Sequence, residues 1–195
     1  MIQFNMKNIM SNKFAIAMAI GITSFLFYLY TLAPTVCWGD SAKLAIPVYN
    51  RTFIFTSGGS HGLHSFLGWL FSLILGQQNL AYSLNLMSAF FSSFTLSLFY
   101  LLMKKITHSQ FASVLSAFVL GISHLFWFVS VITESYSLLS FTFVLQIYTL
   151  INWFDNPHAW KIYVLWLVIF LSLLNHMLNF LFVPVIMVFI LCFSK

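Results

Sequence analysis

Three carboxylates are the residues of this chain best suited to acid–base chemistry, and the 195-residue sequence contains no others. Asp40 follows the first long apolar run, Glu134 lies between two apolar runs, and Asp155 lies in a polar turn, Asp-Asn-Pro-His. A positioned carboxylate can take the proton from a hydroxyl group as that hydroxyl attacks another molecule. The turn composition favours a solvated structural role for Asp155. Asp40 and Glu134 are therefore the candidate catalytic residues.

Each candidate also has a purely structural interpretation. Asp40 precedes Ser41 and could cap a helix that starts there, because Asp is a preferred N-cap residue. Glu134 could belong to an ordinary hydrophilic turn between two apolar helices. A carboxylate at membrane depth costs on the order of 3 kcal/mol, and acids in such positions tend to be functional. Both interpretations stay open here, and a cap can also serve as a general base.

The histidines add a weaker pattern. His61 and His64 are three residues apart and could share one face of a helix, a spacing that two metal ligands can use. No third ligand has a suitable spacing, so we predict no metal site. His176 follows Asn175 at the end of an apolar run, near the expected level of Glu134.

The overall composition identifies the solvent of this protein. Charged residues make up 6% of the chain and hydrophobic residues 61%, and the mean hydropathy is +0.96. Soluble domains contain roughly 25% charged residues, and a chain of this size cannot bury all its apolar side chains in one core. We therefore predict an all-α integral membrane protein. The net charge of +5 comes from basic residues between apolar runs, where they direct topology, so no nucleic-acid partner is expected.

Apolar runs predict about six membrane crossings within one transmembrane domain, residues 1–195, since each crossing needs about 20 apolar residues. The predicted spans are residues 14–33, 80–103, 111–130, 135–154, 159–174 and 177–193. Residues 34–79 form an outer loop. The apolar stretch 61–75 within it is too short for a typical span, so we predict an interfacial helix there.

Basic residues decide the orientation of these spans, because they favour the cytoplasmic side. If residues 61–75 do not cross, Lys104 and Lys105 lie on the same side as the basic N-terminal segment. Six of the eight basic residues are then cytoplasmic: Lys7, Lys13, Lys104, Lys105, Lys161 and Lys195. The N-terminus is cytoplasmic in this topology. The candidate active face, with Asp40, Glu134 and His176, is periplasmic, extracellular or luminal.

Four short strings in order resemble one known family. They are residues 30–36 with 38–41 (Tyr-Thr-Leu-Ala-Pro-Thr-Val, Trp-Gly-Asp-Ser), 85–89 (Asn-Leu-Met-Ser-Ala), 126–127 with 133–138 (Phe-Trp, Thr-Glu-Ser-Tyr-Ser-Leu) and 174–176 (Leu-Asn-His). The chain is similar to the protein O-mannosyltransferase-like membrane family of the GT-C superfamily. The resemblance extends from about residue 28 to residue 184.

The resemblance implies a bundle of the GT-C type and a glycosyltransferase activity. Such enzymes move a sugar, here mannose-like, from a polyprenyl-phosphate carrier to an acceptor hydroxyl on a protein or glycan, outside the cytoplasm. The lipid-phosphate sugar is a co-substrate, and no cofactor is implied. By position Asp40 would be the general base and Glu134 would orient acceptor or sugar. Further substrate-binding residues would be Lys43, Arg51, His61, His64, Tyr136 and His176, with Lys43 or Arg51 neutralising the departing phosphate.

The chain departs from the family pattern at two points. The family's Asp-Ser-Gly-Glu reads Asp-Ser-Ala-Lys here, so Lys43 replaces a second carboxylate. The family's His-Pro-Pro-Gly-Tyr-Pro reads His-Gly-Leu-His-Ser-Phe from His61 onward. Members of the family continue through further spans beyond the six predicted here. We therefore expect a short, truncated or degenerate member, and whether it is an active enzyme stays open. The alternatives are an inactive GT-C-like accessory subunit and a transporter component, although a transporter should carry its polar groups near the bilayer midplane.

Overall fold

The computed structural model describes residues 6–54 and 61–193, with side chains for residues 12–54 and 61–192. The side chain of Lys7 and the whole of Lys195, both used in the topology prediction, lie outside this description. The described residues form helices and contain no strand, so the predicted all-α membrane class is confirmed. The helices are α1 (Met6–Tyr30), α2 (Ser41–Tyr49), α3 (Gly62–Leu75), η1 (Gln77–Asn79), α4 (Leu80–Thr107), α5 (Gln110–Ile122), α6 (His124–Val131), α7 (Ser135–Asp155), α8 (Ala159–Asn175), η2 (Met177–Leu181) and α9 (Phe182–Phe193).

Three helical segments are long and apolar enough to cross a membrane: Asn12–Tyr30, Gln77–Thr107 and Ser135–Asp155. Helices α5 and α6 pass the same test only as a pair, and they are bent by 63° at Ser123. The remaining apolar helices, α3, α8 and the segment Met177–Cys192, are shorter. The described structure therefore supports three spans, or four with the bent pair. The count of six, the span boundaries and the interfacial placement of residues 61–75 stay predictions.

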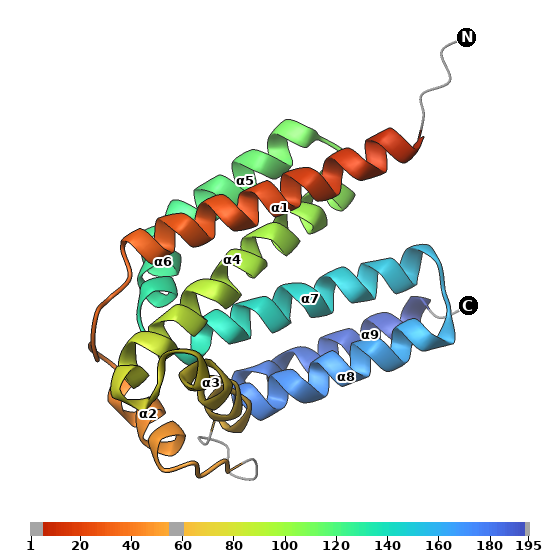
Figure 1. The fold of residues 1–195 in the computed structure, drawn as a ribbon. Helices are drawn as coiled ribbons and strands as arrows, with labels where there is room; N and C mark the ends of the chain where they lie inside the picture. The colour runs from red at the N-terminus through yellow and green to blue at the C-terminus, as the bar shows by residue number, and fades with distance from the viewer. Residues whose placement is uncertain (1–5, 55–60, 194–195) are drawn as a thin grey trace.

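The long helices run back and forth between two ends of the bundle (Figure 1). One end carries α2, α3 and the first turns of α4 and α7, and we call it the Asp40 end. The opposite end carries the last turns of α4 and α7 and the first turn of α8, and we call it the Lys105 end. This alternation brings segments that are distant in the sequence to the same end.

Helix α4 is central, because it packs against α1, α3, α5, α6 and α7. Small side chains allow close approach of its neighbours. Ser97 donates its hydroxyl to the carbonyl of Ala17 on α1 at 2.9 Å, and a Cβ on Gly121 of α5 would lie 2.8 Å from Leu96. Membrane helices commonly pack through small residues in this way, since lipid provides no hydrophobic drive for their association.

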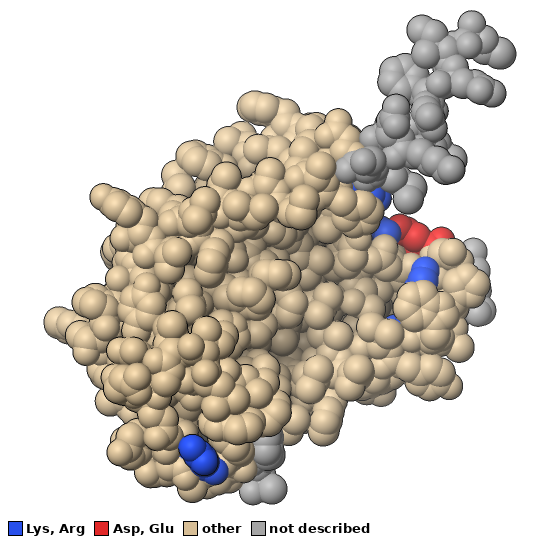
Figure 2. All heavy atoms as spheres, viewed as in Figure 1, with Lys and Arg blue, Asp and Glu red and all other residues tan. Residues whose placement is uncertain are grey.

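Charged atoms on the visible face of the molecule gather at the two ends, and the surface between them carries none (Figure 2). Large apolar side chains are exposed along the helices, among them Met18, Phe118, Leu167 and Val185. Hydroxyl side chains such as Ser88 and Ser92 are instead buried inside the bundle. This distribution fits a protein whose middle surface faces lipid.

Candidate functional site

The Glu134 carboxylate lies against the turn that carries Asp40, the other residue predicted to be catalytic. The Glu134 carboxylate lies so close to the turn before α2 that a Cβ on Gly39 would be 2.7 Å from its Oε1 atom. The backbone N–H of Asp40 donates a hydrogen bond to the same carboxylate. Gly39 has a φ of +70°, a conformation that glycine adopts without steric cost. A glycine here therefore allows the carboxylate to approach the backbone.

Hydrogen bonds, some of them made by Asn85 of α4, hold the segments that carry these carboxylates. Asn85 donates to the carbonyl of Ala33 at 2.7 Å and accepts a bond from the Thr133 hydroxyl at 2.6 Å. Ser41, the first residue of α2, donates its hydroxyl to the carbonyl of Thr133 at 2.9 Å. The N–H of Ala33 donates to the carbonyl of Val131 at 3.0 Å. The end of α1, the start of α2 and the start of α7 are thus held together around one asparagine.

Burial perturbs the acidity of Glu134. The residue is only 8% exposed, and this burial raises the pKa of its carboxyl above the ordinary value of 4.5. The hydrogen bond from the Asp40 N–H opposes the shift, and the negative charge of Asp40 adds to it. Among the described residues the ion pairs are Lys43–Asp40 and Lys105–Asp155, so no cation neutralises Glu134 there.

Asp40 occupies the N-cap position of α2, but its side chain makes no capping hydrogen bond. The carboxylate is more than half exposed, and its nearest cation is Lys43 at 3.9 Å. Lys43 therefore lies beside the candidate base. Arg51 follows the other end of α2, and nine helical residues separate it from Asp40 by about 14 Å. The structure thus brings Lys43 to Asp40 and leaves Arg51 at a distance.

Three aromatic rings meet at the Asp40 end: His61, which precedes α3, His176, between α8 and η2, and Tyr136 of α7. The His61 and His176 ring centroids are 5.0 Å apart, and those of His176 and Tyr136 are 5.4 Å apart. His61 Nδ1 lies 2.7 Å from the carbonyl oxygen of Asn175, to which it donates. His176 Nδ1 accepts a bond from the N–H of Leu178 at 3.1 Å. Burial, and then the neighbouring His61, lower the pKa of His176 and favour the neutral ring that this bond requires.

The environment of His64 differs from that of these three rings. It is fully buried on α3, and neither ring nitrogen has a hydrogen-bond partner within the described residues. Desolvation lowers its pKa well below the usual range, and the charge of His61 adds to this shift. In the described part of the chain, no three His, Cys, Asp or Glu side chains are grouped so that they could hold a metal ion.

An apolar groove leads to Glu134 from the side of the bundle. Its volume is about 630 Å³, and it lies between the bent pair α5–α6 and the start of α7. Its walls are Leu120, Ser123, Leu125, Phe126, Phe128, Val129, Glu134, Tyr136 and Ser140. A second hollow of about 530 Å³ shares Leu120 and Ser123 with it and continues along α5. The bend at Ser123 thus borders a path from the lipid-facing surface to the acid.

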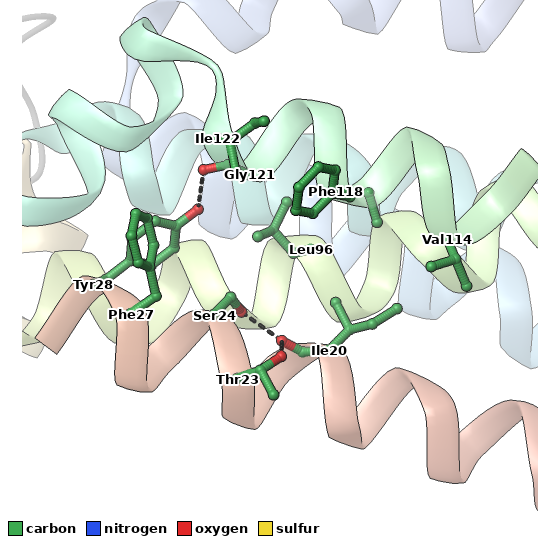
Figure 3. Close-up of a pocket in the computed structure, with 11 residues that line it drawn as sticks. Ile20, Thr23, Ser24, Phe27, Tyr28, Leu96, Val114, Phe118, Gly121 and Ile122 are labelled. Carbon is green, nitrogen blue, oxygen red and sulfur yellow. Dashed lines mark hydrogen bonds between the residues drawn. The ribbon is translucent and has the colours of Figure 1, made fainter. Parts of the chain in front are cut away.

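A different cavity, between α1 and α5, contains none of the candidate residues (Figure 3). The hydroxyl groups that line it donate hydrogen bonds to backbone carbonyls. Thr23 and Ser24 donate to carbonyls one turn earlier in α1, and Tyr28 donates to the carbonyl of Gly121 at 2.9 Å. Because α5 ends one residue later, at Ile122, this carbonyl has no later turn of the helix to bond to. The cavity is therefore an apolar feature of the packing.

Several residues that position the site were not singled out in the sequence for that purpose. Asn85 and Thr133 belong only to the family-like strings, and Ser41 belongs to such a string and to the start of a possible helix. Gly39 precedes Asp40 directly, and a glycine next to a candidate base could have signalled a close backbone approach. No sequence pattern indicated the apolar groove beside Glu134, because the residues of its walls are the apolar residues that any membrane helix contains.

The fold and this site define a helical membrane protein with a buried acid at one end of its bundle. In the comparison with known families, the model described as the protein O-mannosyl-transferase TMEM260 N-terminal domain matches residues 59–195. The chain belongs to this family, as the sequence resemblance predicted. The matched range includes Glu134, Tyr136 and His176 and does not include Asp40. Neither the comparison with curated proteins nor that with solved structures finds a match.

Proposed function

We propose that this chain is a membrane glycosyltransferase that moves a mannose-like sugar from a polyprenyl-phosphate carrier to an acceptor hydroxyl on a protein or glycan. Family membership supports the class of activity. The observation that carries the proposal is the contact of the Glu134 carboxylate with the Asp40 turn, at the head of an apolar groove. A donor that is apolar at one end and charged at the other suits this combination.

In the proposed reaction, Asp40 takes the proton from the acceptor hydroxyl. The hydroxyl oxygen then forms a bond to the anomeric carbon, and the bond from that carbon to the phosphate oxygen breaks with inversion. Lys43, beside Asp40, would stabilise the negative charge on the leaving phosphate. Glu134 would orient the acceptor or the sugar, since its own proton affinity is raised by burial.

The rings of His61, His176 and Tyr136 would bind the sugar or the acceptor beside Glu134. The polyprenyl tail would lie along the groove between α5–α6 and α7, and the bent pair would leave it open to the bilayer. The Asp40 end would face the periplasm, the exterior or a lumen, because Lys104 and Lys105, at the opposite end, favour the cytoplasm.

Replacement of Asp40 tests the proposal. The purified chain in nanodiscs is supplied with polyprenyl-phosphate mannose, radiolabelled in the sugar, and with a hydroxyl-bearing peptide. Asp40→Asn should lower transfer by about 10²–10⁴-fold, the usual contribution of a general base. Asp155→Asn, at the opposite end, is the matched control and should keep the wild-type rate. Undiminished transfer by Asp40→Asn would remove Asp40 from the role of base.

A second candidate function is supported by Lys43, which stands where the family has a carboxylate and lies 3.9 Å from Asp40. An inactive accessory protein could keep the fold while Lys43 neutralises the base. Lys43→Glu separates the two functions. Transfer by the wild-type chain supports the enzyme, whereas transfer only by Lys43→Glu supports the inactive form.

A further inference from the structure

A smaller cavity lies at the Lys105 end, between the last turns of α7 and the first turns of α8. Its volume is about 270 Å³. Its walls include Leu145, Tyr148 and Asn152 of α7 and Trp160, Lys161 and Val164 of α8. None of these residues belongs to the carboxylate site at the other end.

The walls of this cavity change from polar to apolar along the helices. Asn152 and Lys161 lie at its polar end, near the ends of α7 and α8. Leu145 is seven residues earlier on α7, which corresponds to about 10 Å deeper into the bundle. Val164, 37% exposed, lies on the lipid-facing side of α8. A molecule that fits such walls is polar at one end and apolar at the other.

The polar end carries a cation with free bonding capacity. The Lys161 ammonium donates to the carbonyls of Asn152 and Asn156 at 2.9 and 2.7 Å. These are its hydrogen bonds within the described residues, and an ammonium has three donors. The neighbouring carboxylate of Asp155 is already paired with Lys105 at 2.7 Å. An anion could therefore bind Lys161 without displacing a protein carboxylate.

Two aromatic side chains indicate that this polar end lies at the headgroup level of a bilayer. Trp160 is 60% exposed, and the Lys161 ammonium lies 5.9 Å from the centre of its ring. Tyr148 lines the same cavity from α7. Trp and Tyr prefer the headgroup level of a bilayer, where their rings are partly apolar and partly wet.

We infer that this cavity binds one anionic phospholipid of the surrounding leaflet, with its phosphate at Lys161 and the start of an acyl chain between Leu145 and Val164. The apolar inner wall favours an intact lipid over a free phosphate compound. This site does not depend on the proposed glycosyltransferase activity or on which side of the membrane the Lys105 end faces.

The test measures lipid retention by native mass spectrometry of the full chain released from nanodiscs. The probes are phosphatidylglycerol, phosphatidylcholine and water-soluble glycerol 3-phosphate. Lys161→Gln should lower phosphatidylglycerol retention about fivefold, the effect expected of one lysine at a membrane surface. Lys104→Gln is the matched control, since it removes the same charge at the same end but outside the cavity.

A second pair of variants tests the apolar wall and leaves Lys161 intact. Val164→Trp should fill the cavity and lower phosphatidylglycerol retention, whereas Leu167→Trp, exposed on α8 outside the cavity, should not. Equal retention of the two phospholipids by the wild-type chain would overturn the inference. Equal losses in Lys161→Gln and Lys104→Gln, or displacement of the lipid by glycerol 3-phosphate, would overturn it as well.

Discussion

The two ends of the bundle hold their carboxylates in different ways. At the Lys105 end, Asp155 is half exposed and meets Lys105 at 2.7 Å, so its charge is matched within the protein and by water. At the Asp40 end, Glu134 is almost fully buried and accepts a hydrogen bond from a backbone N–H, with no cation against it in the described residues. An ion pair of opposite charges stabilises a helix end. A buried acid with a perturbed pKa and no cation beside it is instead typical of functional sites.

The contacts that hold the neighbouring segments together also differ between the two ends, being partly exposed at the Lys105 end and buried at the Asp40 end. The Lys105 end is tied by lysine side chains, which bond Asn152 and the last carbonyls of α7. The Asp40 end is tied by a buried network in which Asn85 bonds two other segments. Buried networks define geometry more narrowly than exposed ion pairs, because each lost partner leaves an unpaired polar group. The following changes test this contrast.

The largest effect is expected from Asn85→Ala. The change leaves the carbonyl of Ala33 and the hydroxyl of Thr133 without their partner, so the free energy of unfolding should fall by about 3 kcal/mol. Ser92→Ala is the matched control on α4, because the Ser92 hydroxyl is equally buried and has no partner in the described part of the chain. Denaturant unfolding in mild detergent measures both. A loss no greater than that of Ser92→Ala would contradict the role of the network.

Gly39→Ala should act next most strongly. Its Cβ would lie 2.7 Å from Glu134 Oε1, and the φ of +70° disfavours alanine, so we expect a loss of about 1–2 kcal/mol. Gly76→Ala has a similar φ of +82° but meets the flexible amide of Gln78. Sugar transfer should therefore fall in Gly39→Ala and not in Gly76→Ala. Equal transfer by the two variants would mean that the contact with Glu134 does not matter.

Glu134→Gln should lower sugar transfer about tenfold, equivalent to about 1.4 kcal/mol, while raising stability at neutral pH. A raised pKa means that burial stabilises the protonated form. The stability that protonated Glu134 contributes should therefore be fully present below pH 4.5 and be lost as the pH rises through the raised pKa. Thermal unfolding across this range should show a flatter profile for the variant. Identical profiles would show that Glu134 titrates without cost.

The smallest effect is expected at the Lys105 end. Asp155→Asn removes a partly exposed ion pair, which usually contributes about 0–1 kcal/mol, and high salt should reduce the difference further. Its unfolding, measured under the conditions used for Asn85→Ala, should be close to that of the wild type. A loss as large as that of Asn85→Ala would abolish the distinction between the two ends.

Sequence reasoning reached the membrane class, the family and the candidate carboxylates, but not their surroundings. The prediction of a helix starting at Ser41 matches α2, whereas the capping side-chain bond that Asp40 could have made is absent from the described structure. The predicted span 111–130 is divided by a 63° bend at Ser123, which the continuous apolar pattern did not reveal. His64 stays a predicted substrate-binding residue, and a spacing of three residues from His61 does not reveal its full burial on α3.

The sequence by itself determined the solvent of this protein, because 61% hydrophobic and 6% charged residues cannot form the surface of a soluble domain. It also identified Asp40 and Glu134 as the candidates, since the third carboxylate, Asp155, lies in a polar turn. Only the tertiary structure decided that Glu134 contacts Gly39 and Asp40 and that an apolar groove opens beside it. Such contacts depend on how α1, α4 and α7 pack, and packing is set by small residues and buried hydrogen bonds that the apolar pattern does not encode.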